Sequence, residues 1–517
     1  MNLFNKLSLF LQNVKMTKKE KNLMINQNNF EKKSKKDKIC MFQTPMDYYF
    51  LLISKSIIFE NKINLNFIGS WPYYFKPFKK NSIMFSVVNI FKNKIFFFFL
   101  KKKWTKIYKI LEINKLYDFS EFSFRGFAFA VKNFSIIFNN INSKEALLKI
   151  KIEEIYIGDL VYDTYIRYRQ VPTVDIYDIY LKFIIFKTLI IFKNIKNFIK
   201  DKEIEYYFTS YTSYINHGLI ARYLASKKIK VYTFPKQHIQ NFCEKVNSKK
   251  YYAGIKNSDL IYQKFLKEKN KKKIISLGKA KLELRFQGKK EEGSSYMIIP
   301  SYKKNNFEKK NFLHDGVLFL HDFYDAPREA GIKMFNDYYE WTEFVIKVIV
   351  NNQLNIAVKF HPNSKPESIK FNDFLKKKYR NITFLSKDYS NINIFKSKKF
   401  KVGISVSGSV LYELLYFSKV PLYLTKNLVS PLNIIPMAKT KKEYENLIIN
   451  FKKIKIKKKY KDIMMGMYFL LLNDDKSDLN CEIAKKIKLK DLDSNNSSNL
   501  EFFNNELKKE ILKKKYF

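Results

Sequence analysis

Cysteine is scarce in this 517-residue chain, and the few cysteines do not pair. The three residues, Cys40, Cys243 and Cys481, lie far apart and form none of the short spacings of metal-binding motifs. A disulfide framework and a zinc cluster are therefore excluded, and a reducing compartment is indicated. Histidine is also rare, with five residues in the chain.

Long apolar runs are missing as well. A membrane-spanning helix needs roughly 18 to 20 uninterrupted apolar residues. The run from Ile95 to Leu100 is too short, and the run from Leu181 to Phe192 is interrupted by Lys182 and Lys187. The N-terminal residues are polar and basic and lack the apolar core of a secretory signal. We therefore expect a cytoplasmic protein without a membrane span.

Acidic residues are too few to balance the basic ones. Aspartate and glutamate number 48 against 97 lysines and arginines, which gives a formal net charge of +49. The cations are nearly all lysine and are spread over the whole length, whereas sequence-specific nucleic-acid readers favour arginine forks. We expect a solvated lysine surface and no specific nucleic-acid partner. The same charge favours peripheral association with the inner face of the cytoplasmic membrane, where each nearby lysine contributes about 1 kcal/mol.

The length exceeds one ordinary core, so two domains with flanking tails are expected. The expected fold class is α/β, with two Rossmann-like domains facing each other across a cleft. Gly288 to Ser295 is the candidate linker between them. The divisions are a basic flexible leader, a first domain, a second domain and a charged C-terminal tail or helix, at residues 1–42, 43–290, 291–475 and 476–517.

The first domain has alternating apolar runs and polar breaks. A strand at Ile155 to Ile157 precedes a polar segment that contains Asp159 and Asp163. The other expected strands and helices are, in chain order, a helix at 48–59, a strand at 65–68, a helix at 175–200, a strand at 203–208, a helix at 216–226 and a strand at 229–234.

The second domain contains the clearest pattern, between Leu354 and Leu424. It predicts strand, turn, helix, strand, helix, strand, turn, helix and strand. Around this stretch we expect a strand at 316–320 and helices at 338–350, 441–451 and 460–472. In an open parallel sheet, ligands bind beyond the carboxyl ends of the strands. Both turns of the stretch are expected at that edge.

The first turn is Lys359-Phe360-His361-Pro362-Asn363. Pro362 fixes φ and forces a turn, and it favours an extended backbone at His361. Lys359 and His361 alternate on the strand, so they share a face and are candidates to bind one anion. The alternative is that His361 and Pro362 merely end a strand, and the sequence favours the two interpretations equally.

The second turn, Ser405-Val406-Ser407-Gly408-Ser409, opens into a helix. Free N–H groups at a helix start bind anions, and Gly408 allows a phosphate to approach the backbone closely. The alternative is ordinary N-capping by Ser407 or Ser409. Glu413 lies one turn beyond Ser409 on the same face. Its carboxylate suits the paired hydroxyls of a ribose, or else it complements the helix dipole.

Several other kinds of site fail on spacing. Gly403 to Gly408 is one residue too long for a hydrolase nucleophile elbow. Gly278-Lys279-Ala280 lacks the upstream glycine and the Ser/Thr of a phosphate-binding P-loop. The pair Asp491 and Asp493 lies in the polar tail, so no metal site is expected.

Candidates for the base that deprotonates an acceptor hydroxyl are Asp159, Asp163 and His217 in the first domain. Each of them, taken singly, is more often structural. His321 and Asp325 follow the strand at 316–320 and are candidates for ligand binding or for folding of their loop.

These motifs together resemble one family. The order strand, His-Pro, helix, strand, strand, Ser-x-Ser-Gly-Ser and helix with Glu413 resembles the nucleotide-binding half of GT-B glycosyltransferases. It is most similar to capsule and lipopolysaccharide enzymes of bacteria with a His-Pro motif, including Kdo transferases and sialyltransferases. The segments 320–327 and 337–341 are similar to the part that precedes the His-Pro motif in surface-polysaccharide proteins.

The resemblance implies a GT-B-like enzyme with an N-terminal acceptor domain and a C-terminal nucleotide-sugar domain. His361 and the Ser407 to Ser409 loop contact the nucleotide phosphate, and Glu413 contacts the ribose. The reaction is an inverting, metal-independent transfer of sugar, with a CMP-sugar as the favoured donor and a surface glycan or glycolipid as acceptor. The nucleotide sugar is a co-substrate, and no cofactor is expected.

Two alternatives remain: a nucleotide-sugar epimerase of the same fold, and a non-catalytic basic protein that binds nucleic acid or membrane. The residues expected to bind the nucleotide sugar are Lys359, His361, Pro362, Asn363, Ser405, Ser407, Gly408, Ser409, Glu413, His321 and Asp325, and those expected in catalysis are Asp159, Asp163, His217 and His361.

Overall fold

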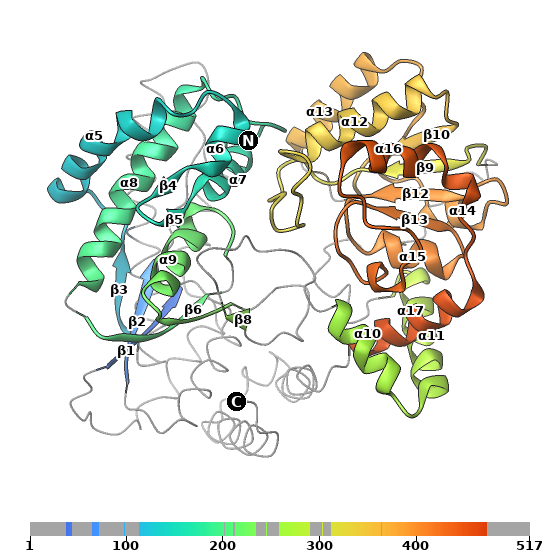
Figure 1. Ribbon diagram of the computed structural model, residues 1–517, viewed down its shortest axis with the longest axis horizontal. Helices are drawn as coiled ribbons and strands as arrows, with labels where there is room; N and C mark the ends of the chain where they lie inside the picture. Colours follow the sequence, from blue (N-terminus) through green and yellow to red (C-terminus); the bar gives the residue numbers. More distant parts are fainter. Residues whose placement is uncertain are drawn as a thin grey trace, which may run out of the picture.

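The chain forms two α/β domains that lie side by side (Figure 1). The computed structural model describes residues 38–43, 65–71, 98, 113–200, 202–209, 212–233, 244–245, 258–289, 302, 312–362, 364 and 366–472. The first domain runs from blue to green in Figure 1, and the second is coloured mainly from yellow to red.

The first domain is built on a six-stranded sheet with the strand order β3-β2-β1-β6-β7-β8. Every neighbouring pair is parallel except the edge pair β7 and β8. The strands are β1 (Lys38–Gln43), β2 (Leu65–Trp71), β3 (Ile113–Asp118), β6 (Ile204–Thr209), β7 (Lys230–Thr233) and β8 (Glu244–Lys245).

The described helices of this domain pack into one apolar core with the sheet. The longest, α8, has a buried apolar face that includes Leu181, Ile184 and Phe192. The helices are α5 (Phe124–Phe138), α6 (Lys144–Lys149), α7 (Gly158–Arg169), α8 (Ile179–Ile199) and α9 (Ile215–Ser226), and a short antiparallel pair, β4 (Lys151–Ile152) and β5 (Ile155–Tyr156), separates α6 from α7.

The second domain is built on a five-stranded, wholly parallel sheet with the order β11-β10-β9-β12-β13. Its three inner strands and β13 are buried along their whole length, which explains why they appear in the sequence as continuous apolar runs. The strands are β9 (Gly316–Phe319), β10 (Ile356–Lys359), β11 (Phe384–Leu385), β12 (Val402–Ser405) and β13 (Val420–Tyr423).

The helices of the second domain cover this sheet. Asp337 begins α12 with a side-chain cap, in which its carboxylate accepts from the Glu340 N–H at 2.8 Å. The helices are α10 (Ser258–Lys267), α11 (Lys271–Phe286), α12 (Tyr338–Asn351), α13 (Pro366–Lys378), α14 (Asn391–Lys396), α15 (Val410–Tyr416), η2 (Ser430–Leu432), α16 (Lys441–Ile449), η3 (Phe451–Lys453) and α17 (Lys458–Leu472).

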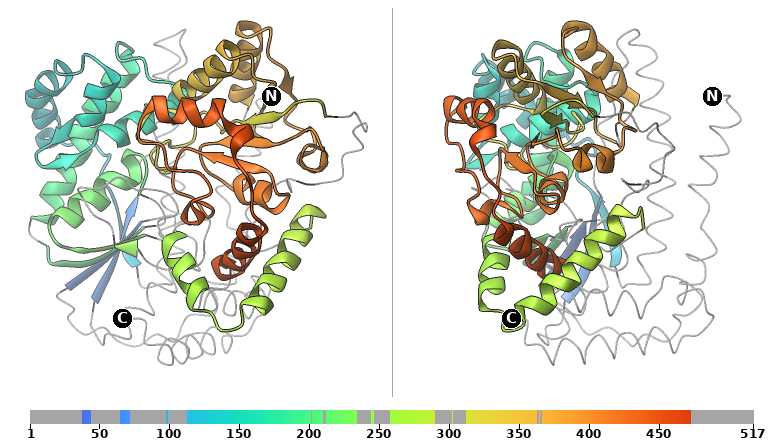
Figure 2. Two further views of the ribbon diagram at one scale, coloured as in Figure 1. Left: turned by 45° about the vertical axis from the view of Figure 1, so that its right-hand side comes forward. Right: turned by 90° about the vertical axis from the view of Figure 1, so that its right-hand side faces the viewer.

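Helices α10 and α11 belong to the core of the second domain. Ile261, Phe265 and Leu282 share one buried cluster with its sheet, and Figure 2 shows both helices beside α17. The approach is close, because a Cβ added at Gly278 in α11 would lie 1.9 Å from the carbonyl oxygen of Met465 in α17. The core of the second domain therefore includes residues 258–286, which the sequence assigned to the first domain.

Both sheets repeat one topology. When each sheet is renumbered from its own first strand, the strands without β8 follow the order 3-2-1-4-5, which is the Rossmann order without its sixth strand. The chain reverses direction across the sheet between β1 and β6 in the first domain and between β9 and β12 in the second. The predicted fold class, α/β with two Rossmann-like domains in a GT-B-like arrangement, is confirmed.

The segment between β9 and α12, residues 320–337, joins the two domains. Asp337 accepts hydrogen bonds from Tyr162 and Thr173 of the first domain, each at 2.5 Å. Tyr324 is buried in the core of the first domain. In Figure 1 this segment is the yellow loop that reaches toward α6 and α7.

Most predicted elements are present. All nine elements expected between Leu354 and Leu424 occur in the predicted order, and the helices expected at 175–200, 216–226, 338–350, 441–451 and 460–472 are confirmed as α8, α9, α12, α16 and α17. The predicted strands at 65–68, 203–208, 229–234 and 316–320 are β2, β6, β7 and β9. The helix predicted at 48–59 lies outside the described residues.

One expectation about the first domain is wrong. Residues Lys38–Gln43 are not part of a flexible leader, because they form β1, which pairs with both β2 and β6 inside the sheet. The polar segment after Gly158, for which the sequence predicted no helix or strand, is the buried helix α7. It folds as a helix because its polar side chains meet partners from distant parts of the chain.

Candidate active site

His361 lies directly after β10, where the chain turns. The turn closes when Ser364 donates to the His361 carbonyl oxygen from its backbone N–H, at 3.1 Å, and from its hydroxyl, at 2.7 Å. Burial lowers the pKa of His361. Nearby Asp322 opposes this shift, and nearby Lys359 adds to it. Asp322 is fixed in turn by a 2.7 Å hydrogen bond from the Ser368 hydroxyl.

Lys359, the last residue of β10, is a buried cation. Its Nζ donates to the carbonyl oxygen of Lys387 at 3.1 Å, and it forms no ion pair with any described carboxylate. Burial lowers its pKa to about 8, although Asp388 and Glu413 act in the opposite direction. A buried ammonium without a counter-ion is a favourable place for an incoming anion.

His321 lies between the two predicted turns, because β9 is the strand between β10 and β12. Its Nε2 is 3.4 Å from the Ser405 hydroxyl, and its ring stacks on Tyr338 with ring centres 4.7 Å apart. Burial lowers the pKa of His321 to about 3, helped by the neighbouring His361 and opposed by the backbone of Ser407. His321 is therefore neutral at physiological pH and is within electrostatic reach of residues from both turns.

The second turn has the small-residue geometry that the sequence predicts. The Ser405 hydroxyl donates to the Ser407 carbonyl oxygen at 3.1 Å. Gly408 has φ of +106°, and a Cβ placed on it would meet nothing within 4 Å, so the bend is open on that side. Ser409 makes no side-chain cap to α15. Its hydroxyl instead accepts a 2.8 Å hydrogen bond from Arg285, so capping does not explain this serine.

Glu413 is occupied by protein partners. Its carboxylate accepts from Arg285 at 2.8 Å and from the hydroxyl of Tyr302. Both Glu413 and Arg285 are buried. The carboxylate thus links α15 to α11, and its contact with a ribose stays a prediction.

Asp159 is also paired. Arg222 of α9 holds both of its carboxylate oxygens, at 2.7 and 2.5 Å, and also donates to the Tyr156 carbonyl oxygen at 2.7 Å. This buried ion pair fixes α7 against α9. A catalytic base must be able to accept a proton, and Asp159 is already fully engaged.

Asp163, one turn further along α7, has no such partner. The residue is buried, and its Oδ1 has no hydrogen-bond partner in the part of the chain that the structure describes. Burial raises the pKa of Asp163 well above its usual value, while Arg328 of the second domain pulls it down. Perturbed carboxyls of this kind concentrate at functional sites. Of the three candidate bases, Asp163 has the environment that suits the role.

The remaining candidates are distributed around this region. His217 lies in the first turn of α9, with its Nε2 3.1 Å from the amide nitrogen of Asn216. Asp325 is exposed and pairs with Arg167 of the first domain at 3.4 Å. Pro362 follows His361 in the turn, and Asn363 lies outside the described residues.

Three residues that the sequence did not single out complete the junction between the domains. Tyr338, stacked on His321, has its pKa raised first by burial and then by acids that include Asp163 of the first domain. Tyr214, which precedes α9, has φ of +63° and ψ of +159°, a backbone conformation that is costly for a side chain of this size. Arg328 approaches Tyr162 in the first domain. The rarity of arginine in this lysine-rich chain was the one available signal for Arg328.

The structure therefore brings some predicted residues together and separates others. Residues of both turns and His321 gather at the carboxyl edge of the second sheet, and Tyr338 connects that edge to Asp163. Asp159 and Glu413 are instead engaged by buried arginines. Within the described residues, no group of three or more histidines, cysteines or acids is placed to hold a metal ion. No described helix is both long enough and apolar enough to cross a bilayer.

Comparison with known proteins adds little to this picture. No family model and no curated protein matches the chain. One solved structure to which it is similar is the UDP-GlcNAc 2-epimerase from Neisseria meningitidis bound to UDP-GlcNAc. That similarity covers 86% of this chain and 98% of the epimerase, at 9% identity and a TM-score of 0.24. The fold assignment rests on the strand orders described above.

Proposed function

We propose that this protein is a metal-independent, inverting glycosyltransferase that moves a sugar from a nucleotide sugar to a surface-glycan acceptor. The observation that supports it most is the meeting of three adjacent strand ends, β10, β9 and β12, at the switch point of the second sheet. They carry Lys359 and His361, His321, and the Ser405 to Ser409 bend. Ligands of open α/β sheets bind at such points.

In this proposal the second domain stabilises the leaving nucleotide phosphate. Lys359 supplies a positive charge, and His361 donates a hydrogen bond to a phosphate oxygen. The open bend at Gly408 offers backbone N–H groups. Fixed donors in a buried site stabilise charge that develops in the transition state without reorganising.

The first domain activates the acceptor. Asp163 takes the proton of the attacking hydroxyl while the hydroxyl oxygen bonds to the anomeric carbon of the donor. The bond from that carbon to the phosphate oxygen breaks on the opposite face, which inverts the configuration. Burial that raises the pKa of a carboxyl group makes its ionised form a stronger base, which matches the environment of Asp163.

The test is sugar transfer in vitro from CMP-, UDP-, GDP- and CDP-sugars, after a thermal-shift screen of the four nucleotides. A ligand at 100 times its dissociation constant adds about 2.7 kcal/mol of stability. The variant is His361→Ala, and the control is His314→Ala, which changes a histidine just before β9, at the opposite end of the sheet. Undiminished transfer by His361→Ala would count against the proposal. Release of an epimerised sugar without an acceptor would favour the epimerase alternative.

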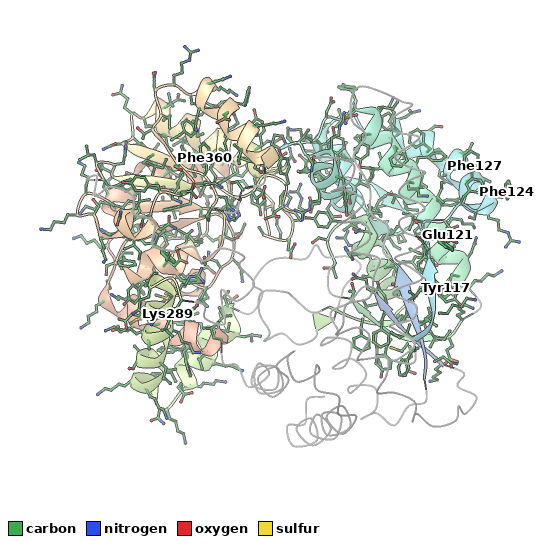
Figure 3. The ribbon with its side chains drawn as sticks, turned by 180° about the vertical axis from the view of Figure 1, so that it is seen from behind. Tyr117, Glu121, Phe124, Phe127, Lys289 and Phe360 are labelled. Atoms are coloured by element: carbon green, nitrogen blue, oxygen red, sulfur yellow. The ribbon has the colours of Figure 1, made fainter. Side chains whose placement is uncertain are left out.

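We also propose that α5 attaches the protein to the inner face of the cytoplasmic membrane, where a glycolipid acceptor resides. Phe124 is 84% exposed and Phe127 is 43% exposed, and both lie at the outer edge of the first domain (Figure 3). The helix contains Arg125 and Lys132 and no acidic residue. Exposed aromatic groups with cations and no acids suit an anionic lipid surface.

A further inference from the structure

Arg328 has a buried guanidinium whose two terminal nitrogens lack partners among the described residues. Arg328 lies in the segment that joins the domains, and two hydrogen bonds close its turn. Glu329 N–H donates to the Ala326 carbonyl oxygen at 3.2 Å, and Gly331 N–H donates to the Arg328 carbonyl oxygen at 3.0 Å. The residue is 8% exposed, and neither of its terminal nitrogens has a hydrogen-bond partner. Its guanidinium carbon is 5.2 Å from the ring centre of Tyr162, a cation–π contact with the first domain.

Two other buried arginines are paired with carboxylates. Arg222 and Arg285 are also buried, and each is held by a carboxylate, Asp159 and Glu413 respectively. Buried charges are paired in folded proteins because removal from water disfavours an isolated ion. Arg328 departs from that rule at the junction of the two domains.

An acid of the first domain has the same property and interacts electrostatically with Arg328. Asp163 is buried with an unpartnered Oδ1, and Arg328 acts on the pKa of Asp163 although burial dominates its upward shift. The two side chains nevertheless form no ion pair within 4.0 Å. A donor fork and an acceptor that both lack hydrogen-bond partners among the described residues match a ligand that carries both complementary groups.

We propose that Arg328 and Asp163 form a subsite for an oxyanion of the acceptor, a carboxylate or a phosphate ester, next to its reacting hydroxyl. The oxyanion binds the two terminal nitrogens of Arg328, for which a planar two-oxygen group has the right shape. The hydroxyl donates to Asp163. This inference rests on the proposed function, because it assigns Asp163 to the acceptor side, and it adds that the acceptor is anionic at that position.

The experiment measures binding of small anions to the full-length protein. Saturating CMP or UMP is present throughout, so that phosphate cannot report on the Lys359 and His361 site. The probes are methyl phosphate and methyl glucuronide, with methyl glucoside as the neutral reference. The variants are Arg328→Met and Arg328→Lys, and the control is Arg380→Met, which removes an exposed arginine of the second domain.

Binding of one or both anions is expected to weaken at least tenfold in Arg328→Met and to remain unchanged in Arg380→Met. Arg328→Lys keeps the charge but not the fork, so it is expected to retain part of the affinity. The stronger of the two probes identifies the group as carboxylate or phosphate. If Arg328→Met fails to fold, the comparison of Arg328→Lys with Arg380→Met decides.

Equal anion binding by all variants, or no binding by the native protein, overturns the subsite and indicates that ordered water fills it. A change confined to the KM of the donor would also overturn the inference, because it would place the oxyanion on the donor sugar. If nucleotides still stabilise Arg328→Met, the proposed function is unaffected. If the native protein binds no nucleotide, the proposed function itself is rejected.

Discussion

At the scale of single residues, one buried carboxyl group of α7 is paired with an arginine and a second one is not. Asp159 and Asp163 lie one turn apart on α7 and are both buried. Only Asp159 has an arginine bound to it. The sequence could not distinguish them, because Arg222 is 63 residues away from Asp159 along the chain.

This contrast predicts opposite effects for matched substitutions. Asp159→Asn leaves Arg222 buried and unpaired, so the free energy of unfolding should fall by about 3–5 kcal/mol. Asp163→Asn removes a buried charge without a partner, so stability should stay level or rise while sugar transfer is lost. Urea denaturation and transfer assays on both variants check this. A strongly destabilised Asp163→Asn with normal transfer would show that the carboxylate is structural.

The lowered pKa of Lys359 predicts that stability and nucleotide affinity depend on pH. Its pKa of about 8 in the folded chain lies below its ordinary value of 10.5, so between those pH values the unfolded chain binds more protons. The free energy of unfolding should therefore rise with pH across that window, by on the order of 3 kcal/mol. An anion that binds Lys359 favours its protonated form, so nucleotide affinity should fall above pH 8.

The measurements for Lys359 are urea denaturation and calorimetric nucleotide titration between pH 7 and pH 10. Lys359→Met is the control and should remove this contribution to both pH dependences. If the native protein and Lys359→Met show identical pH dependences of stability and of nucleotide affinity, Lys359 titrates normally and does not bind the phosphate.

At the scale of elements, the second domain was predictable because its βα units are local. Each strand there is a short buried apolar run followed by a turn and a helix, so periodicity alone located the elements from Leu354 to Leu424. The strand β1 was missed because its six residues follow a long polar stretch and pair only with strands far along the chain. The helix α7 was missed because several of its buried polar residues, Asp159, Tyr162 and Thr164, are paired with distant parts of the chain.

The same limit applies to the candidate site. Strand order places His321 between the two turns, and the sequence predicted that these residues meet at one sheet edge. The partners of Glu413 and Asp159 were not predictable, because both are long-range arginine contacts. Arg328 and Tyr338 were not predicted because their importance depends on how the two domains meet.

The contact of α11 with α17 gives a prediction about packing. Gly278→Ala places a methyl group 1.9 Å from the Met465 carbonyl oxygen, and backbone cannot yield as a flexible side chain does. Overpacking of this kind costs about 1–3 kcal/mol or more. Gly408→Ala is the comparison, since it meets open space and should cost only the strain of its positive φ. Denaturation curves that rank these two variants in the reverse order would contradict the packing described here.

At the scale of the whole molecule, a set of electrostatically interacting polar residues spans the two domains. It runs from Lys359 and His361 through His321 and Tyr338 to Asp163 and Arg328. The segment 320–337 carries residues of this region and also forms the contacts between the domains. If the proposed function is correct, donor binding in the second domain and acceptor binding in the first both involve this segment.

The exposed face of α5 gives a prediction about the molecule as a whole. Phe124→Ser combined with Phe127→Ser should reduce sedimentation with anionic vesicles several-fold, because the buried aromatic area is lost. Leu260→Ser is the control, an exposed apolar residue on α10 of the second domain. Equal vesicle binding by both variants and the native protein would mean that α5 does not face the lipid.

The central claim is that the bend after β10 and the bend after β12 bind one phosphate group. A crystal structure of the full chain with CMP or UDP measures this directly. Phosphate density is expected within hydrogen-bonding distance of both His361 and the Ser407 to Ser409 backbone. Phosphate density away from both bends, or at only one of them with the other unoccupied, would contradict it.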